Sequence, residues 1–275
     1  MGQLVRSDSE RSGKISFRMP LLAVVAGLLL AVFLLAPWPL AVKSWALLHG
    51  LCAQRPSHSL ALGETLLPFD ARMTGIYGGF ATTTIWLLAK GRFRAWRFPR
   101  RSIVVLLAAF VGSLGIDGAN ALLVDIGVPP FYPPDNRLRL TTGLLTGIAL
   151  AVALCHVLAT TLWRRGDARL SPVMHIGEVA LLVVLQGPFA AVALSGWDMA
   201  HAPLSLLLLG SAATVVAMLT LASLTMLRLR DRTYASAEDL QGVAAVSLLV
   251  GLVLMGAIAG VRFWAEHAFG IVPLM

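Results

Sequence analysis

Long apolar stretches separated by short polar segments are the main pattern of this sequence. Seven stretches approach or reach the length of about 20 mostly apolar residues that a helix needs to cross a bilayer. They are residues 19–40, 74–89, 102–124, 138–163, 172–195, 204–227 and 242–264, of which the second is the shortest. The pattern predicts an all-α, polytopic membrane helix bundle of about seven transmembrane helices. It forms a single domain over residues 19–275, preceded by a flexible cytoplasmic tail at residues 1–18.

Small residues and one proline refine the expected packing. The dipeptide Gly187-Pro188 inside the fifth stretch predicts a kink, because proline interrupts the hydrogen bonds of a helix. Pairs of glycines four residues apart allow two helix backbones to approach closely. Such pairs occur at Gly75 and Gly79, at Gly143 and Gly147, and at Gly256 and Gly260.

Composition supports a membrane protein and excludes the main alternatives. Hydrophobic residues make up 57% of the chain and charged residues 13%, and the mean hydropathy is +0.80. A soluble domain carries about 25% charged and about 45–50% apolar residues. The composition therefore excludes a soluble enzyme, a disordered chain and a small secreted module held by disulfides.

The basic residues indicate how the bundle is oriented. The net charge is +8, and with the N-terminus inside, 16 of the 22 Lys and Arg residues fall in cytoplasmic segments. The other six are Lys43, Arg55, Arg72, Arg137, Arg139 and Arg262. This positive-inside asymmetry predicts an N-in, C-out topology in the cytoplasmic (inner) membrane of a prokaryote. Cys52 and Cys155 then lie on opposite sides of the membrane, so we expect them not to pair.

A basic loop at residues 90–101 alternates arginines with aromatic residues. That pattern is found in proteins that bind single-stranded nucleic acid. Because two apolar stretches flank the loop directly, we expect it to bind anionic lipid headgroups instead, with no nucleic-acid partner.

Candidate chemistry gathers on the outer side, where polar residues enter apolar segments. Residues 49–77 form an otherwise apolar connection, which we expect to fold back onto the bundle. It contains Arg55, His58, Glu64, Asp70 and Arg72. Asp117 and Asn120 lie three residues apart near the outer end of the third stretch, so a helix places them on one face. Asn136 and Arg139 begin the fourth stretch on the same side. Ionisable groups at such depth are candidate functional groups.

These residues resemble the signature of an uncharacterised prokaryotic membrane-protein family, a domain of unknown function. The first block is Cys52-Ala-Gln-Arg and the second is Asp70-Ala-Arg-Met-Thr-Gly-Ile-Tyr77, where the family reads Cys-His-Gln-Arg and Cys-Ala-Arg-Cys-Thr-Gly-Ile-Tyr. Asp117-Gly118 and the segment 136–143 match two further elements. The resemblance covers about residues 45–160 and implies no activity.

The departures from the family pattern concern the positions suited to a metal or to redox chemistry. Cys52 is retained, whereas Ala53, Asp70 and Met73 replace a histidine and two cysteines. The remaining set is a poor zinc site, so we predict no metal. If the family uses a metal there, we interpret that metal as a structural staple and the retained polar residues as the functional part.

The leading hypothesis is a pocket on the outer side for an anionic small molecule, phosphorylated and linked to a lipid. Arginine binds phosphate and carboxylate groups through two parallel hydrogen bonds. The candidate binding residues are Arg55, Arg72, Tyr77, Asn120, Asn136 and Arg139. Asp117 and Asp70 are the candidates for a general base. Whether the protein catalyses, transports or only binds is open at this point.

Two alternatives remain. In the first, Arg55, Arg72 and Arg139 only neutralise Glu64, Asp70 and Asp117, and the protein is a non-catalytic accessory or assembly subunit of a membrane complex with a membrane-protein partner. In the second, His156 and His175 face each other and bind haem or a quinone. Spacing alone supports the second alternative, so we predict no cofactor.

Overall fold

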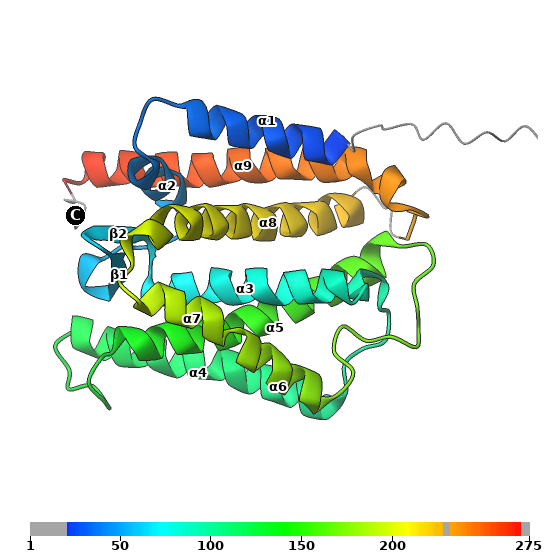
Figure 1. The fold of residues 1–275 in the computed structure, drawn as a ribbon, viewed down its shortest axis with the longest axis horizontal. Coiled ribbons are helices and arrows are strands. Elements are labelled where there is room, and N and C mark those ends of the chain that lie inside the picture. The colour runs from blue at the N-terminus through cyan, green and yellow to red at the C-terminus, as the bar shows by residue number, and fades with distance from the viewer. Residues whose placement is uncertain (1–20, 228–231, 271–275) are drawn as a thin grey trace, which may run out of the picture.

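Each of the seven apolar stretches forms a helix in the computed structural model, which describes residues 21–227 and 232–270 (Figure 1). The long helices are α1 (Leu21–Leu35), α3 (Ala71–Ala89), α4 (Arg101–Asp125), α5 (Asn136–Leu162), α6 (Ile176–Leu185), α7 (Gly187–Leu194), α8 (His201–Leu227) and α9 (Ala237–Ala268). The expected tail at residues 1–18, together with the basic residues Arg228 and Arg230, lies outside the described residues.

Five helical segments within the described ranges are long and apolar enough to cross a membrane. They are Arg101–Asp125, Asn136–Leu162, Ile176–Leu194, Asp198–Leu227 and Ala237–Ala268. Helix α1 has 15 described residues and falls short in length. Helix α3 has 19 residues, but Arg72, four threonines and three glycines lower its hydropathy. The architecture is therefore a mostly helical bundle with five candidate membrane spans.

Short elements close one end of the bundle, which we call the hairpin end. Helix α2 (Leu40–Leu48), the 3-10 turn η1 (Pro56–His58) and the antiparallel strands β1 (Ser59–Leu62) and β2 (Thr65–Asp70) lie there. The hairpin turns at Gly63, whose φ of +62° suits glycine. Its inward side chains are buried in the core. Residues 49–77 therefore fold back onto the bundle as expected, although the sequence analysis predicted neither the strands nor α2.

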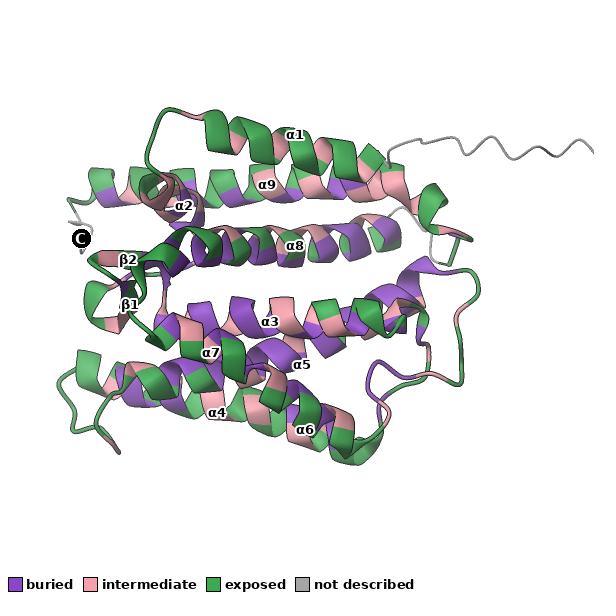
Figure 2. Ribbon diagram, viewed as in Figure 1, coloured by how far each residue is buried: buried purple, intermediate pink, exposed green. Residues whose placement is uncertain are grey.

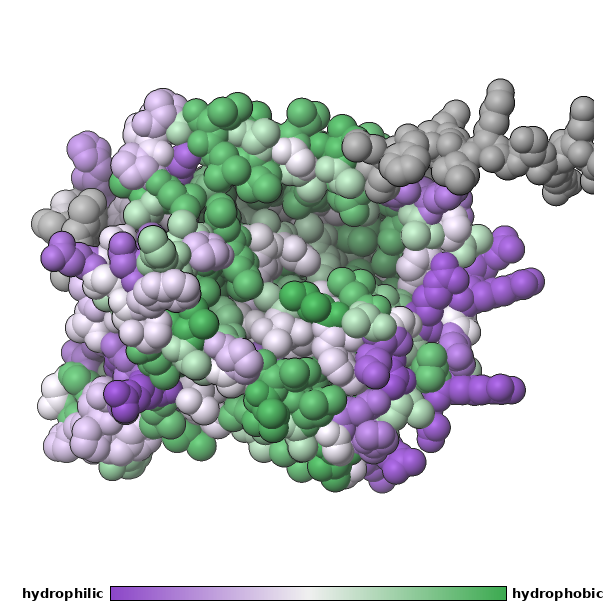
Figure 3. All heavy atoms as spheres, in the orientation of Figure 1, coloured by the Kyte–Doolittle hydropathy of each residue, from purple (hydrophilic) through white to green (hydrophobic). Residues whose placement is uncertain are grey.

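The opposite end, which we call the basic end, carries the arginine-rich loops. It comprises residues 90–100 with the 3-10 turn η2 (Arg92–Arg94), residues 163–175 and residues 232–236. A further 3-10 turn, η3 (Asp198–Ala200), precedes α8 at the hairpin end. Figure 3 shows hydrophobic residues along the flank of the bundle and hydrophilic residues at both ends, which is the distribution expected of a membrane protein.

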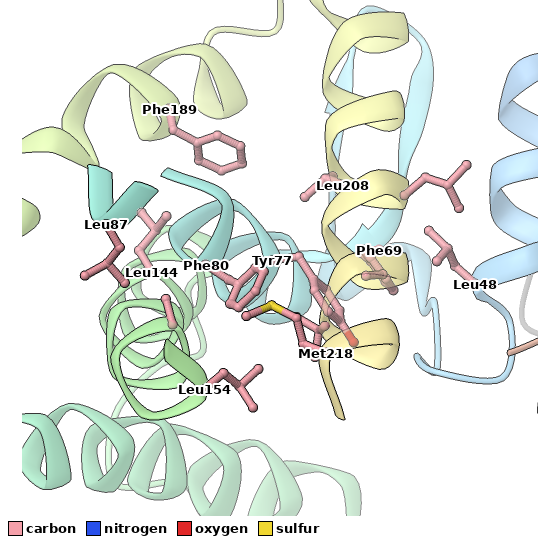
Figure 4. Packing of buried hydrophobic residues seen from close by; sticks show 14 of the residues in the cluster. Leu48, Phe69, Tyr77, Phe80, Leu87, Leu144, Leu154, Phe189, Leu208 and Met218 are labelled. Carbon is pink, nitrogen blue, oxygen red and sulfur yellow. The ribbon is translucent and has the colours of Figure 1, made fainter. Parts of the chain in front are cut away.

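The core is centred on α5 and the helices that pack against it. The most apolar part of α5 is 72% buried, against 11% for α4, and Figure 2 shows burial concentrated on α3, α5 and α8. Phe69, Tyr77, Phe80, Phe189 and Leu208 belong to the main apolar cluster (Figure 4). Phe69 and Tyr77 stack with their ring centroids 4.8 Å apart.

The expected kink is confirmed. Helix α6 ends at Leu185 and α7 begins at Gly187, directly before Pro188, which has no N–H to donate. The buried side chain of Gln186 donates to the carbonyl oxygen of Leu182 (3.1 Å) and to the hydroxyl of Thr83 (3.4 Å). The break is thus held against α3 through its side chain.

Two of the three glycine pairs face each other across α3 and α5. A Cβ at Gly75 would collide with the carbonyl oxygen of Leu140, and one at Gly143 with the carbonyl oxygen of Arg72. The same holds for Gly147 and Ile76. In contrast, a Cβ at Gly256 would meet no described atom within 4 Å. The first two pairs therefore bring two backbones into contact, and the third does not.

The variant Gly143→Ala is expected to destabilise the protein, and Gly256→Ala is its matched control. An alanine in a helix is about 1 kcal/mol more favourable than glycine, whereas overpacking costs about 1–3 kcal/mol. Thermal unfolding in detergent should therefore show a lower midpoint for Gly143→Ala and an equal or higher one for Gly256→Ala. Equal midpoints for the two variants would contradict the close contact of α3 with α5.

Candidate functional site

The hairpin end brings together polar residues from three helices. Asp70 accepts a hydrogen bond from the N–H of Met73 (2.8 Å) and so begins α3, which places Arg72 in its first turn. Asp135 caps α5 in the same way through the N–H of Arg137 (2.8 Å). Asn136 and Arg139 follow in the first turn of α5, while Asp117 and Asn120 lie near the end of α4.

Arg72 and Asp117 form a largely buried ion pair. Nη2 and Nε of Arg72 lie 2.5 Å and 3.0 Å from Oδ2 of Asp117, whose side chain is 4% exposed. The hydroxyl of Tyr132 donates to Oδ1 of the same carboxylate (3.3 Å). Both oxygens of Asp117 therefore have partners, one on α3 and one in the loop after α4.

Asn120 fixes that loop over the ion pair. Its Oδ1 accepts from the N–H groups of Phe131 (2.8 Å) and Tyr132 (3.3 Å), and its Nδ2 donates to the carbonyl oxygen of Tyr132 (3.0 Å). Burial raises the pKa of Tyr132, and the charge of Asp117 adds to the shift. The phenol therefore stays protonated and able to donate to Asp117.

Arg139 has no acidic partner, although it is only 4% exposed. Within the described ranges the one hydrogen bond of its side chain goes from Nη1 to Oδ1 of Asn136 (2.8 Å), and none of the five ion pairs includes it. Asn136 in turn donates to the carbonyl oxygens of Ser57 (3.3 Å) and Ser59 (3.4 Å). A buried cation without a counter-charge is costly, so Arg139 is the most unusual residue of this end.

Arg139 and Arg55 together make the edge near η1 electropositive. Burial lowers the pKa of His58, and the guanidinium groups of Arg139 and Arg55 lower it further. Arg55 pairs with Asp125 at 2.6 Å, and both side chains are more than one-third exposed. The sequence analysis did not name Asp125. Of the neutralising pairs it considered, only Arg72 with Asp117 is among the ion pairs of the described residues.

The other two candidates have different surroundings. Tyr77 is 7% exposed and lies in the apolar cluster against Phe69. The carboxylate of Asp70 accepts the N–H of Met73 at the start of α3. No hydrogen bond or ion pair between described residues joins either one to Arg72, Asp117 or Arg139.

A buried hydrogen-bond network that the sequence analysis missed joins α2 to the end of α9. Nδ1 of His49 lies 2.8 Å from Oε1 of Gln54, and Nε2 lies 2.8 Å from Oε2 of Glu266. Nε of Arg262 donates to Glu266 (2.8 Å), and its Nη1 donates to the carbonyl oxygens of His49 and Cys52. The sequence did contain an indication of this network, because Arg262 and Glu266 are oppositely charged and lie four residues apart at the end of an apolar stretch.

The network fixes the orientation of the His49 ring. Nε2 of Gln54 donates to the carbonyl oxygens of Pro68 (2.8 Å) and Trp45 (3.0 Å), so its Oε1 must be the atom facing His49. Nδ1 of His49 therefore donates to Gln54, and Nε2 faces the carboxyl group of Glu266. The ring of His49 lies between the rings of Trp45 and Phe263 (centroid distances 4.6 Å and 4.2 Å).

Cys52 lies beside Asp70 at the start of α3. Its Sγ accepts weak hydrogen bonds from the N–H groups of Gln54 (3.4 Å) and Asp70 (3.5 Å). In the part of the chain that is described, no three His, Cys, Asp or Glu side chains form a group that could hold a metal ion. Cys52 and Cys155 are both buried and free, which confirms that they do not pair.

The two histidines of the haem alternative have separate surroundings at the basic end. Nδ1 of His175 accepts the N–H of Glu178 (3.2 Å) at the start of α6, and Glu178 pairs with Arg92 (2.8 Å). His156 packs edge-on against Phe98, with ring centroids 5.1 Å apart. No interaction between described residues links His156 to His175.

Removing the charge of Asp117 is expected to destabilise the fold, because it leaves Arg72 unpaired. Breaking a buried ion pair costs about 3–5 kcal/mol, while an exposed pair contributes about 0–1 kcal/mol. Asp117→Asn should therefore unfold at clearly lower denaturant than Asp125→Asn, its exposed control. In a double-mutant cycle with Arg72→Gln, the losses of unfolding free energy in the two single variants should add up to more than the loss in the double variant. Additive effects would contradict direct coupling.

Cys52 is expected to be almost inert to thiol reagents in the folded protein. Burial raises the pKa of its thiol to about 12, with a further contribution from the charge of Asp70. Only the thiolate reacts, so about one thiol in ten thousand is reactive at pH 8. Maleimide labelling of a Cys155→Ala variant should be slow at pH 8, rise tenfold per pH unit, and become fast on denaturation. Rapid labelling at pH 8 without denaturant would refute this.

Comparison with known proteins finds a family model, and its matched segment contains this site. Residues 52–153 match the family model described as Predicted membrane protein (DUF2085), which confirms the resemblance to an uncharacterised membrane-protein family. The chain has no match among curated proteins or solved structures. The matched segment runs from Cys52 into α5 and contains Arg72, Asp117, Asn120 and Arg139. These four residues thus lie in a segment that resembles the predicted membrane proteins of DUF2085.

Proposed function

We propose that this multi-pass membrane protein binds an anionic small molecule at its hairpin end, and that the ligand is phosphorylated and lipid-linked. The observation that carries the proposal is the buried guanidinium of Arg139, which has no acidic partner among the described residues. A phosphate or carboxylate beside it would supply the missing counter-charge and accept two parallel hydrogen bonds.

The neighbours of Arg139 suit that role. Asn136 accepts one guanidinium N–H (2.8 Å), which orients the fork and leaves its other donors for a ligand. The charges of Arg72 and Arg139 both act on Tyr132, and those of Arg55 and Arg139 both act on His58, so the three arginines surround one region. Arg72 and Arg55 keep partly exposed side chains and are available to a ligand from the surface.

The candidate base belongs to the same region. Asp117 lies between Arg72 and the hydroxyl of Tyr132. If its carboxylate accepted a proton from a ligand, the hydroxyl of Tyr132 would be the neighbouring group able to exchange that proton. Asp70 is the second candidate, and its carboxylate already holds the start of α3. The proposed function is therefore binding or processing of this ligand, with Asp117 and Asp70 as the candidate bases.

The membrane topology we propose has seven spans, with the N-terminus inside and the C-terminus outside a prokaryotic inner membrane. It adds α1 and α3 to the five candidate spans. The support is the excess of basic residues in the sequence segments that this topology places inside, 16 against six in those it places outside. In this topology the hairpin end faces outward, and the basic loop at residues 90–101 contacts anionic headgroups of the inner leaflet.

A second candidate function is a non-catalytic accessory subunit that binds another membrane protein. It is favoured by the use of Asn120 and Asn136 to hold loops of the same chain. The exposed apolar flanks of α1 and α4 offer surfaces to a partner. The experiment on Arg139 separates the two functions.

Arg139→Gln is expected to release the ligand, and Arg137→Gln, an exposed neighbour on the same helix, is the control. Native mass spectrometry of protein extracted with its own lipids should show a phosphorylated species on the wild type and on Arg137→Gln. A hydrogen bond to a charged group contributes about 1.5–3 kcal/mol, so occupancy by Arg139→Gln should fall about tenfold or more. Equal occupancy, or a co-purifying protein without such a species, would reject the proposal.

His58 provides an independent readout of the same event. An anion beside Arg139 and Arg55 offsets the positive charges that hold the pKa of His58 low, so binding should raise that pKa. Histidine proton resonances followed against pH, with and without inorganic phosphate as the probe, measure the shift. An unchanged titration of His58 at saturating phosphate would show that no anion binds there.

The topology is tested with single cysteines at exposed loop positions in a cysteine-free background. Pro133→Cys lies at the hairpin end and Arg165→Cys at the basic end. In intact cells, a membrane-impermeant maleimide should label Pro133→Cys and leave Arg165→Cys unlabelled until the cells are broken. The reverse result would invert the topology.

A further inference from the structure

An apolar groove runs between α4 and α5 toward the basic end. It has a volume of about 580 Å³, within the range of about 300–1,000 Å³ that is usual for small-molecule sites. Leu107, Ala108 and Val111 line it from α4, and Ala149 and Ala153 line it from α5. Since the exposed flank of α4 is apolar, the groove opens toward the hydrocarbon of the membrane.

Phe98 lines both this groove and a small neighbouring pocket. The pocket is formed by Arg97, Arg100 and Ser171 together with Phe98, Val173 and Met174. Both arginines are exposed, and neither has an acidic partner within 4 Å in the described ranges. Ser171 is 3% exposed, and its hydroxyl has no partner among the described atoms.

The start of α4 adds further donors to that pocket. Arg100 is the N-cap residue and makes no side-chain cap, and the first turn contains no acidic residue. The first N–H groups of a helix favour a negative charge. Two free arginines, an unsatisfied hydroxyl and a helix N-terminus thus converge where the apolar groove ends.

His156 provides a polar group on the wall of the groove. It packs edge-on against Phe98, and its Nδ1 is buried without a hydrogen-bond partner in the described part of the chain. An ionisable side chain without a partner at membrane depth is costly unless a ligand interacts with it. Its position next to Phe98 is where the apolar and polar parts of an amphipathic ligand would meet.

We propose that the groove and the pocket together bind one anionic phospholipid. Its acyl chain lies between α4 and α5, its ester groups lie beside His156, and its phosphate lies over Arg97 and Arg100. Charge complementarity selects this occupant, because a neutral lipid or a quinone leaves both arginines without a counter-charge. The site lies at the opposite end of the bundle from Arg139, so it does not depend on the anion site of the hairpin end.

The test measures lipid retention on the full chain in detergent by native mass spectrometry. Phosphatidylglycerol should be retained about tenfold more than zwitterionic phosphatidylcholine. The double variant Arg97→Gln/Arg100→Gln should lose this preference, whereas Arg101→Gln, which does not line the pocket, should keep it. Equal retention of the two lipids by the wild type, or an unchanged preference in the double variant, would overturn the proposal.

Filling the groove tests the position of the acyl chain. Ala153→Phe should lower retention of phosphatidylglycerol about tenfold while the protein stays monodisperse, and Ala108→Phe from the opposite wall is the second variant if the first does not fold. Unchanged retention in a folded groove variant would overturn the proposal. So would a quinone in place of the phospholipid, or a dimer of wild-type protein that either variant dissociates. Arg139→Gln should leave this retention unchanged, which separates the two sites.

Discussion

The contact between the backbones of α3 and α5 is the constraint on which the rest of the structure depends. Gly75 and Gly79 meet Gly143 and Gly147 so closely that even a methyl group would not fit. This contact places α3, which is less hydrophobic than the five candidate spans, in the interior beside α5, the most buried of those spans. It also sets the site, because the carbonyl of Arg72 lies against Gly143, one turn after Arg139.

The same contact explains why Arg72 has an acidic partner and Arg139 has none among the described residues. Burying α3 and α5 against each other brings two guanidinium groups to one end of the bundle, where each needs a counter-charge. Helix α4 supplies a single buried carboxylate, Asp117, and Arg72 takes it. Asn136, a neutral acceptor, is what remains for Arg139. Among the described residues, Arg139 is therefore the buried arginine of the hairpin end that is left without a carboxylate partner.

The sequence was sufficient for features that depend on local pattern. Apolar length located the helices, Gly187-Pro188 located the break, and the glycine pairs indicated close helix packing without identifying which helices are neighbours. It was insufficient where a partner is chosen by tertiary structure. His49 and Glu266 are 217 residues apart, and Arg55 pairs with Asp125 rather than with a nearby acid. The short hairpin was missed because its strands are too brief and too buried to show a clear alternation.

Hydrogen bonds hold residues 52–73 in place. Asp70 caps α3, and Cys52 accepts two backbone N–H groups. The side chain of His49, with Gln54, Glu266 and Arg262, then ties this segment to α9. These bonds are buried, so they are strong and directional. They keep the hairpin in place beside Arg139. The side chains that hold this segment are therefore different from the side chains of Arg55, Arg72 and Arg139.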